Sequence, residues 1–142
     1  YVILLEQSYV IFRLNSFSRN LRNELKTSKK IYFYDNGIRN ALIANFNQID
    51  GRADRGALWE NFLISERKKF LEYNRGNSWF WRTKEQKEID LVEERDGKIT
   101  GYEFKWNPDQ KVKIPRLFLD SYENSDFQVI HRDNCDSFLL EY

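Results

Sequence analysis

Two carboxylates and a lysine near the middle of the chain have the types and spacing that could bind a divalent cation. The dipeptide Asp96-Gly97 lies between two alternating runs, and it is the strongest short signal for a two-residue hairpin turn. Such a turn pairs Asp90 with Glu103 across the hairpin, and the period-two alternation puts Lys105 on the same face. Like charges directly opposite each other destabilise a sheet, so we expect this pair to be present for its chemistry.

Two things relieve the repulsion between Asp90 and Glu103. A divalent cation can lie between the carboxylates, or a raised pKa can neutralise one of them. Mg²⁺ prefers oxygen ligands and usually keeps several waters, so a binding site made of two carboxylates suits it. In the alternative interpretation the hairpin is a solvent-facing charged surface on which Glu88 and Lys105 form an ion pair.

A third carboxylate, Glu60, lies on a long helix that apolar periodicity predicts over residues 56–73. Its neighbours three and four positions away are Gly56, Ala57, Leu63 and Ile64. The Glu60 side chain is therefore predicted to point toward the packed side, where a carboxylate needs a partner or a metal. The alternatives are a core glutamate bonded to an arginine or a backbone donor, and Glu66 in place of Glu60.

The elements around these residues predict a mixed α/β fold. After the helix, β-like runs cover residues 78–82, 88–95 and 98–106, a second helix covers 115–123, and strands follow at 126–132 and 137–142. Upstream, strands at 9–14 and 30–34 and a helix at 38–44 resemble the second half of a winged helix. We therefore expect a partial winged-helix-like segment over residues 1–45, a linker over 46–55 and an αβββαβ domain over 56–142.

Composition excludes several classes of protein. The 142 residues carry 23 Lys+Arg and 22 Asp+Glu, so no global basic field indicates nucleic-acid binding. One cysteine excludes an internal disulfide framework and favours a reducing, cytoplasmic location. No apolar run approaches the ~20 residues that cross a bilayer, so no membrane partner is expected. The chain has no methionine and begins at Tyr1, so we expect it to be a piece of a longer protein.

Charge is unevenly distributed along the chain. Residues 1–75 carry 13 basic and 8 acidic residues, whereas residues 76–142 carry 10 and 14. The candidate nucleic-acid-binding residues of the basic part are Arg13, Arg19, Arg22, Lys26, Lys29 and Lys30. DNA or RNA would bind through them by charge, and the alternative is a solvated basic face without a ligand.

The pattern of Glu60 on the first helix, Asp90 on the second strand and Glu103-Phe104-Lys105 on the third resembles the PD-(D/E)xK nuclease superfamily. The resemblance implies a restriction-endonuclease-like αβββαβ core. It also implies that Asp90, Glu103 and the backbone carbonyl of Phe104 hold Mg²⁺ or Mn²⁺. Lys105 would orient the attacking water, and Glu60 would bind a second metal or orient a metal-bound water.

The whole chain also resembles a C-terminal domain of uncharacterised function attached to bacterial and archaeal AAA-type ATPases. The phrases that carry this resemblance are Lys30-Ile31-Tyr32-Phe33-Tyr34-Asp35-Asn36-Gly37, Gly56-Ala57-Leu58-Trp59-Glu60-Asn61, Phe80-Trp81-Arg82, Glu88-Ile89-Asp90 and Tyr102-Glu103-Phe104-Lys105. Ile89 stands where the first nuclease motif commonly has proline. The resemblance implies an upstream ATPase domain in the same chain, since these 142 residues contain no phosphate-binding glycine loop of the P-loop type.

Three functions are compatible with these observations. The first is a metal-dependent endonuclease domain that hydrolyses DNA or RNA. The second is a non-catalytic nucleic-acid-binding module that guides the ATPase, and the third is a regulatory or interaction module with vestigial carboxylates. The intact set of Asp90, Glu103 and Lys105 favours the first, because decay usually removes a ligand or the lysine.

Overall fold

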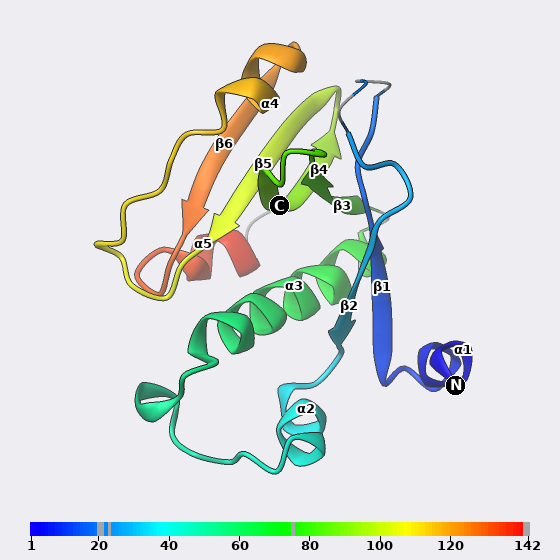
Figure 1. The fold of residues 1–142 in the computed structure, drawn as a ribbon, viewed down its shortest axis with the longest axis vertical. Coiled ribbons are helices and arrows are strands. Elements are labelled where there is room, and N and C mark those ends of the chain that lie inside the picture. Colours follow the sequence, from blue (N-terminus) through cyan, green and yellow to red (C-terminus); the bar gives the residue numbers. More distant parts are fainter. Residues whose placement is uncertain (20–21, 23, 75, 141–142) are drawn as a thin grey trace.

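The computed structural model describes residues 1–19, 22, 24–74 and 76–140, and the chain has a mixed α/β structure (Figure 1). In the described residues the helices are α1 Val2–Gln7, α2 Asn36–Leu42, α3 Arg55–Tyr73, α4 Arg116–Ser121 and α5 Cys135–Leu140, with a short 3₁₀ helix at Ile49–Gly51. The strands are β1 Ile11–Asn15, β2 Lys29–Phe33, β3 Asn77–Arg82, β4 Glu88–Arg95, β5 Lys98–Phe104 and β6 Ser125–Ile130. Of the helices in this part of the chain, none is both long and apolar enough to cross a bilayer.

The strands form a two-stranded sheet of β1 and β2 and a four-stranded sheet in the order β3-β4-β5-β6. Strands β3, β4 and β5 pair antiparallel, whereas β5 and β6 pair parallel. A parallel pair needs a crossover connection, and the segment that contains α4 supplies it. The predicted order of helix, three strands, helix and strand after residue 55 is therefore confirmed.

The hairpin between β4 and β5 has the predicted register from the turn as far as Leu91, while the predicted pair of Asp90 with Glu103 lies beyond the end of the ladder. Its ladder runs from Arg95 opposite Lys98 to Leu91 opposite Tyr102. Asp96 and Gly97 form the two-residue loop, with φ angles of 50° and 76°. Such left-handed angles at both central positions give the turn whose twist matches the flanking strands, which is why an Asp-Gly dipeptide specifies it.

The predicted strand at 137–142 is wrong in the described residues, because residues 135–140 form α5. Phe138 is buried, with its ring centroid 5.0 Å from that of Tyr102 and 5.5 Å from that of Phe104. Cys135 and Leu139 pack against the same core. These three positions have helical spacing, so contact with the sheet selects a helix where the short apolar run alone was ambiguous. Residues 141 and 142 of the predicted strand lie outside the described residues.

Hydrophobic cores cover both faces of the four-stranded sheet. On one face, α3 and α5 pack on Leu91, Tyr102 and Phe104 of β4 and β5. On the other face, α4 packs on Ile89 and Val92, among other residues. Ile89 and Leu91 therefore lie in different cores, although residues two positions apart on a regular strand share a face.

An extra residue in β4 explains where Ile89 lies. The pairs Trp79–Val92 and Trp81–Ile89 enclose one residue on β3 but two on β4, which are Asp90 and Leu91. This two-against-one arrangement is a β-bulge, which bends the strand and changes the direction of its side chains. Bulges are common next to functional sites, and this one contains Asp90.

The β1-β2 hairpin lies beside α3, at the far side of the molecule from β6 (Figure 1). Phe12, Leu14 and Tyr32 of the hairpin share one hydrophobic core with Trp59 and Leu63 of α3. The hairpin and the larger sheet therefore pack on a common helix. The predicted boundary between residues 45 and 56, and the winged-helix likeness of residues 1–45, stay predictions.

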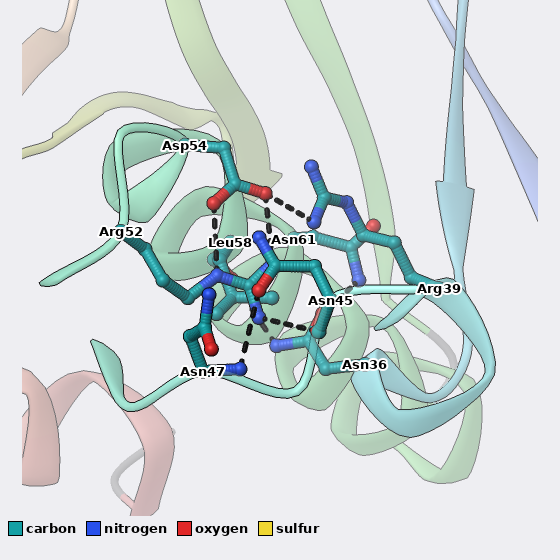
Figure 2. Close-up of polar contacts among 8 residues, drawn as sticks. All are labelled: Asn36, Arg39, Asn45, Asn47, Arg52, Asp54, Leu58 and Asn61. Atoms are coloured by element: carbon teal, nitrogen blue, oxygen red, sulfur yellow. Dashed lines mark hydrogen bonds and ion pairs between the residues drawn. The ribbon is translucent and has the colours of Figure 1, made fainter. Parts of the chain in front are cut away.

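Polar contacts fasten the segment between β2 and α3 to the start of α3 (Figure 2). The Asn61 side chain accepts a hydrogen bond from Phe33 N at 2.9 Å and donates to Phe33 O at 3.0 Å. Asp54 accepts hydrogen bonds from both Arg52 and Arg39. This network holds the end of β2 against α3, and so fixes the distance between the side chains of β2 and those of the neighbouring helical turn.

Candidate functional site

Asp90 lies at the point where the ladder between β4 and β5 ends. The last ladder pair is Leu91 with Tyr102, and one position further the Asp90 carboxylate accepts a hydrogen bond from the backbone N–H of Phe104 at 2.9 Å. A side-chain oxygen thus takes the position of a backbone acceptor between the two strands. The Asp90 side chain, which belongs to the bulge, therefore points toward β5.

The surroundings of Asp90 disfavour its charge. Burial raises the pKa of Asp90 to about 8, and the negative charges of Glu60 and Glu103 act in the same direction. The Phe104 N–H and the Lys30 ammonium act in the opposite direction and do not compensate. The carboxylates that crowd Asp90 therefore help to raise its pKa, as expected of a like-charge cluster.

Glu103 and Lys105 lie on β5 and at its end. The Lys105 ammonium is 3.0 Å from Glu103 Oε1, and both side chains are half-buried. Burial opposes the charge on Lys105, but Glu103, with further help from Asp90 and Glu60, outweighs it and raises the pKa of Lys105. The alternative interpretation paired Lys105 with Glu88, and this is wrong, because Glu88 pairs with Lys30 and Arg82.

Glu60 points into the structure from the second turn of α3, as predicted. Its Oε1 accepts a hydrogen bond from the Tyr32 hydroxyl at 2.6 Å and lies 3.5 Å from the Lys30 ammonium. The Glu60 side chain is 26% exposed, so it is neither fully buried nor free in solvent. Its partners are a tyrosine and a lysine of β2, and not the arginine or backbone donor of the alternative interpretation. Glu66, the competing candidate, is paired with Lys69 at 2.7 Å.

Lys30 links the carboxylates of α3 and β4. It forms ion pairs with Glu60 and Glu88, and the second oxygen of Glu88 accepts a hydrogen bond from Arg82. Burial opposes the charge on Lys30, but Glu60, Glu88 and Asp90 together hold its pKa above the usual range. Sequence reasoning missed Tyr32 and Arg82 as neighbours of the site, and it gave Glu88 the wrong partner. The alternation in β2, which puts Lys30 and Tyr32 on the same face, is the signal that could have indicated two of the contacts.

The six predicted nucleic-acid-binding residues do not form one free basic surface. Arg13 pairs with Glu6 at 2.5 Å, Arg19 pairs with Glu94, and Lys30 lies within the carboxylate cluster. The other three are exposed and form no ion pair with any residue that the structure describes; they are Arg22, Lys26 and Lys29. Half of the predicted positive charge is therefore balanced within the chain.

A cavity of about 240 Å³ opens beside Glu103 and Lys105. Glu88 of β4 also lines it, and the segment between β5 and α4 contributes Lys111 and Lys113. The end of the β4-β5 hairpin that carries Glu103 and Lys105 is thus open to solvent through this cavity, and lysine side chains line the opening. The predicted site residues Glu60, Asp90, Glu103 and Lys105 are close enough to affect one another's charge, and Glu103 and Lys105 reach the cavity.

The donor set of this cluster suits a hard divalent cation. Asp90 and Glu103 offer only carboxylate oxygens, which Mg²⁺ and Mn²⁺ prefer over nitrogen or sulfur ligands. Within the described ranges no group of three or more His, Cys, Asp or Glu side chains is arranged to hold a metal ion. The assignment of Asp90 and Glu103 as metal ligands therefore stays a prediction, and a cation there would compete with the ammonium group of Lys105.

Comparison with known proteins places the chain in a family. A family described as a domain of unknown function, DUF4143, matches residues 55–135, which include the whole candidate site except Lys30 and Tyr32. The chain belongs to the DUF4143 family. A second family, also described as a domain of unknown function and designated DUF8612, matches residues 1–49. The predicted resemblance to a domain of uncharacterised function is thus confirmed, while the DUF4143 description assigns no activity and the nuclease likeness stays a prediction.

Two curated mycobacterial proteins are similar to this DUF4143 chain. They are the uncharacterized proteins Mb2031c of Mycobacterium bovis and Rv2008c of Mycobacterium tuberculosis, each 28% identical over 107 residues. The match covers 74% of this chain and 24% of each relative, so the chain spans only about a quarter of their length. No solved structure gives a significant match.

Proposed function

We propose that this domain is a metal-dependent nuclease of the PD-(D/E)xK type, which hydrolyses phosphodiester bonds of DNA or RNA. The observation that carries the proposal is the crowding of Glu60 and Glu103 around Asp90, beside a cation-lined cavity. Like-charge crowding of this kind is unfavourable unless a ligand balances it, and perturbed carboxylates in a cavity are typical of functional sites. A restriction-endonuclease-like core is part of the proposal, and the αβββαβ order supports it.

Each residue of the cluster has a distinct part in this mechanism. Asp90 and Glu103 would hold Mg²⁺ or Mn²⁺, together with the backbone carbonyl of Phe104. The metal supplies Lewis-acid stabilisation of charge on the scissile phosphate. Lys105 orients the attacking water with its ammonium group, which is already held at the cavity by Glu103. Glu60, held by Tyr32 and Lys30, would bind a second metal or orient a metal-bound water from the α3 side.

The decisive experiment measures cleavage and metal binding together. We expect the wild-type domain to bind Mn²⁺ in calorimetry and to cut single- or double-stranded substrates only with the metal, and Asp90→Asn to abolish the binding. Lys105→Ala should lower cleavage by roughly 10²–10³-fold, the range typical of removing one positioned donor that stabilises charge in the transition state, while nucleic-acid binding persists. Lys98→Ala is the matched control, because Lys98 lies on the same strand, is exposed and pairs with Asp126 outside the cluster. Equal losses in the two lysine variants would contradict the assigned role of Lys105.

A non-catalytic nucleic-acid-binding module is the second candidate. The observation that favours it is that Lys30 and Lys105 already pair with the carboxylates of the cluster. Nucleic-acid binding without cleavage, in assays of the domain alone and of the longer protein with its proposed upstream ATPase, would select this function. Absence of both binding and cleavage would instead select the regulatory or interaction module.

A further inference from the structure

Two neighbouring cavities lie along the segment between β5 and α4. The first, of about 240 Å³, is the one that Glu103 and Lys105 line. The second, of about 590 Å³, shares Glu88, Lys113 and Pro115 with it. The other residues that line the second cavity are Trp81, Lys87, Ile114, Arg116 and Leu117. Because the two cavities share three lining residues, they are adjacent, and we name the surface that lines them the basic groove.

The charge in the basic groove is positive and largely unbalanced. Its cations are Lys87, Lys105, Lys111, Lys113 and Arg116, and its carboxylates are Glu88 and Glu103. Both carboxylates are already engaged, Glu88 by Lys30 and Arg82 and Glu103 by Lys105. The four cations other than Lys105 are exposed, and none forms an ion pair within the described part of the chain. Their charge is therefore available to a ligand.

The groove also offers an apolar wall next to its cations. Ile114 is 56% exposed, although it is a large aliphatic residue, and Pro115 and Leu117 lie beside it. Phosphate oxygens would meet the lysine and arginine side chains, while sugars and bases would cover the aliphatic surface. Contact of both kinds along one groove suits a polynucleotide better than a small anion, which would occupy only one cavity.

We propose that the basic groove binds the sugar-phosphate backbone of a nucleic acid and leads it to Glu103 and Lys105. This inference rests on the proposed function, since it identifies the surface through which that site meets its substrate. It also relocates the nucleic-acid contact from the segment between Arg13 and Lys30 to the one between Lys111 and Arg116. Residues 111–116 adjoin the cluster directly, whereas half of the earlier set is paired within the chain.

The test is fluorescence anisotropy with labelled single- and double-stranded oligonucleotides, in chelator so that nothing is cut. The groove variant is Lys111→Gln/Lys113→Gln/Arg116→Gln, and the matched control is Arg22→Gln/Lys26→Gln/Lys29→Gln. Each removes three exposed cations without an ion pair in the described residues, so both variants change the net charge equally. Thermal unfolding checks that each variant is folded, and single substitutions replace a triple variant that is not.

We expect the groove variant to bind at least tenfold more weakly at low salt and the control to bind within about twofold of wild type. Each lost phosphate contact reduces the slope of log affinity against log salt by about one, so the groove variant should lose about two to three units of slope. An equal or larger loss in the control overturns the inference. So does wild-type protein that binds no oligonucleotide, or that binds polyglutamate as well as it binds nucleic acid.

The outcome for the groove is separable from the outcome for the catalytic proposal. Groove-dependent binding with no Mn²⁺ uptake and no cleavage supports the groove and rejects the nuclease. Mn²⁺-dependent cleavage that is unchanged in the groove variant, but lost with the control set, supports the nuclease and rejects the groove.

Discussion

Helix α3 and strand β4 carry two clusters of charged side chains that differ in how their charges are paired. At one end, Arg67 of α3 donates hydrogen bonds to both oxygens of Glu93 on β4, at 2.7 and 2.9 Å, and a third to the Phe138 carbonyl at 2.6 Å. Both side chains are less than a tenth exposed. One cation meets one carboxylate in the bidentate geometry that repays much of the cost of burial.

At the other end of the same elements, charge is not paired one to one. Glu60 and Glu103 both raise the pKa of Asp90, which itself accepts a hydrogen bond from the Phe104 N–H. Lys30 is shared between Glu60 and Glu88. The two sites therefore differ: Glu93 is paired with one arginine, whereas Asp90 has two carboxylates nearby and a backbone N–H as its hydrogen-bond donor. An unbalanced cluster beside a cavity is expected where a ligand supplies the missing charge.

The largest effect should come from breaking the balanced pair. Arg67→Met leaves Glu93 buried without its cation, and breaking a buried pair in this way costs about 3–5 kcal/mol of unfolding free energy. Lys68→Met is the control, because Lys68 forms only a half-exposed pair with Glu72 one turn away, worth about 0.3–0.5 kcal/mol. Urea unfolding measures both variants. Similar losses of unfolding free energy in the two variants would show that the buried Arg67–Glu93 pair stabilises the fold no more than the exposed Lys68–Glu72 pair does.

A smaller effect of opposite sign is expected at Asp90. A carboxyl group whose pKa is raised on folding stabilises the protein at low pH, and this contribution is lost as pH rises from about 4 toward about 8. An asparagine side chain at this position has no charge to lose and keeps an oxygen for the Phe104 N–H. In chelator, Asp90→Asn should therefore be more stable than wild type at pH 9, by on the order of 2 kcal/mol, and about equal at pH 4.

Unfolding curves at both pH values, with Asp90→Ala as control, test this sign. The alanine variant loses the acceptor as well as the charge, so it should be less stable than the asparagine variant at every pH. An asparagine variant that is destabilised at pH 9 would mean that the charged carboxylate is itself the better partner of Phe104. The cluster would then be balanced in the same sense as the Arg67–Glu93 pair.

Local chemistry made much of this region predictable from sequence. Asp96-Gly97 fixes the turn, and the turn fixes the register of the hairpin, because a two-residue loop allows one pairing. The 3.6-residue period likewise fixed α3 to within one residue and placed Glu60 on its inward side. Both signals depend only on neighbours in the chain.

The other contacts of the site join residues far apart in the sequence, and no local sequence pattern predicts them. Tyr32 and Glu60 are 28 positions apart, and Lys30 and Glu88 are 58 apart. The bulge at Asp90 goes together with the placement of Trp81 and Ile89 in one core and of Leu91 in the other, which depends on packing against both faces of the sheet. Arg13 and Arg19 pair with Glu6 and Glu94, and no local sequence pattern identifies these acidic partners.

The smallest predicted effect tests whether Lys30 is a counter-ion that a metal must compete with. Its ammonium lies between Glu60 and Glu88 and favours the charged form of Asp90, so it places positive charge near the carboxylate that would hold a divalent cation. Lys30→Met removes that competing charge and should tighten Mn²⁺ binding about tenfold, equivalent to about 1.4 kcal/mol. Lys29→Met is the matched control, because Lys29 is the exposed neighbour in β2 and should leave the affinity unchanged. Calorimetric titration measures both without reference to cleavage. Weaker binding in Lys30→Met would show the reverse: Lys30 would then hold Glu60 and Glu88 in place, and the cluster would be organised by its lysine in the way that Glu93 is organised by Arg67.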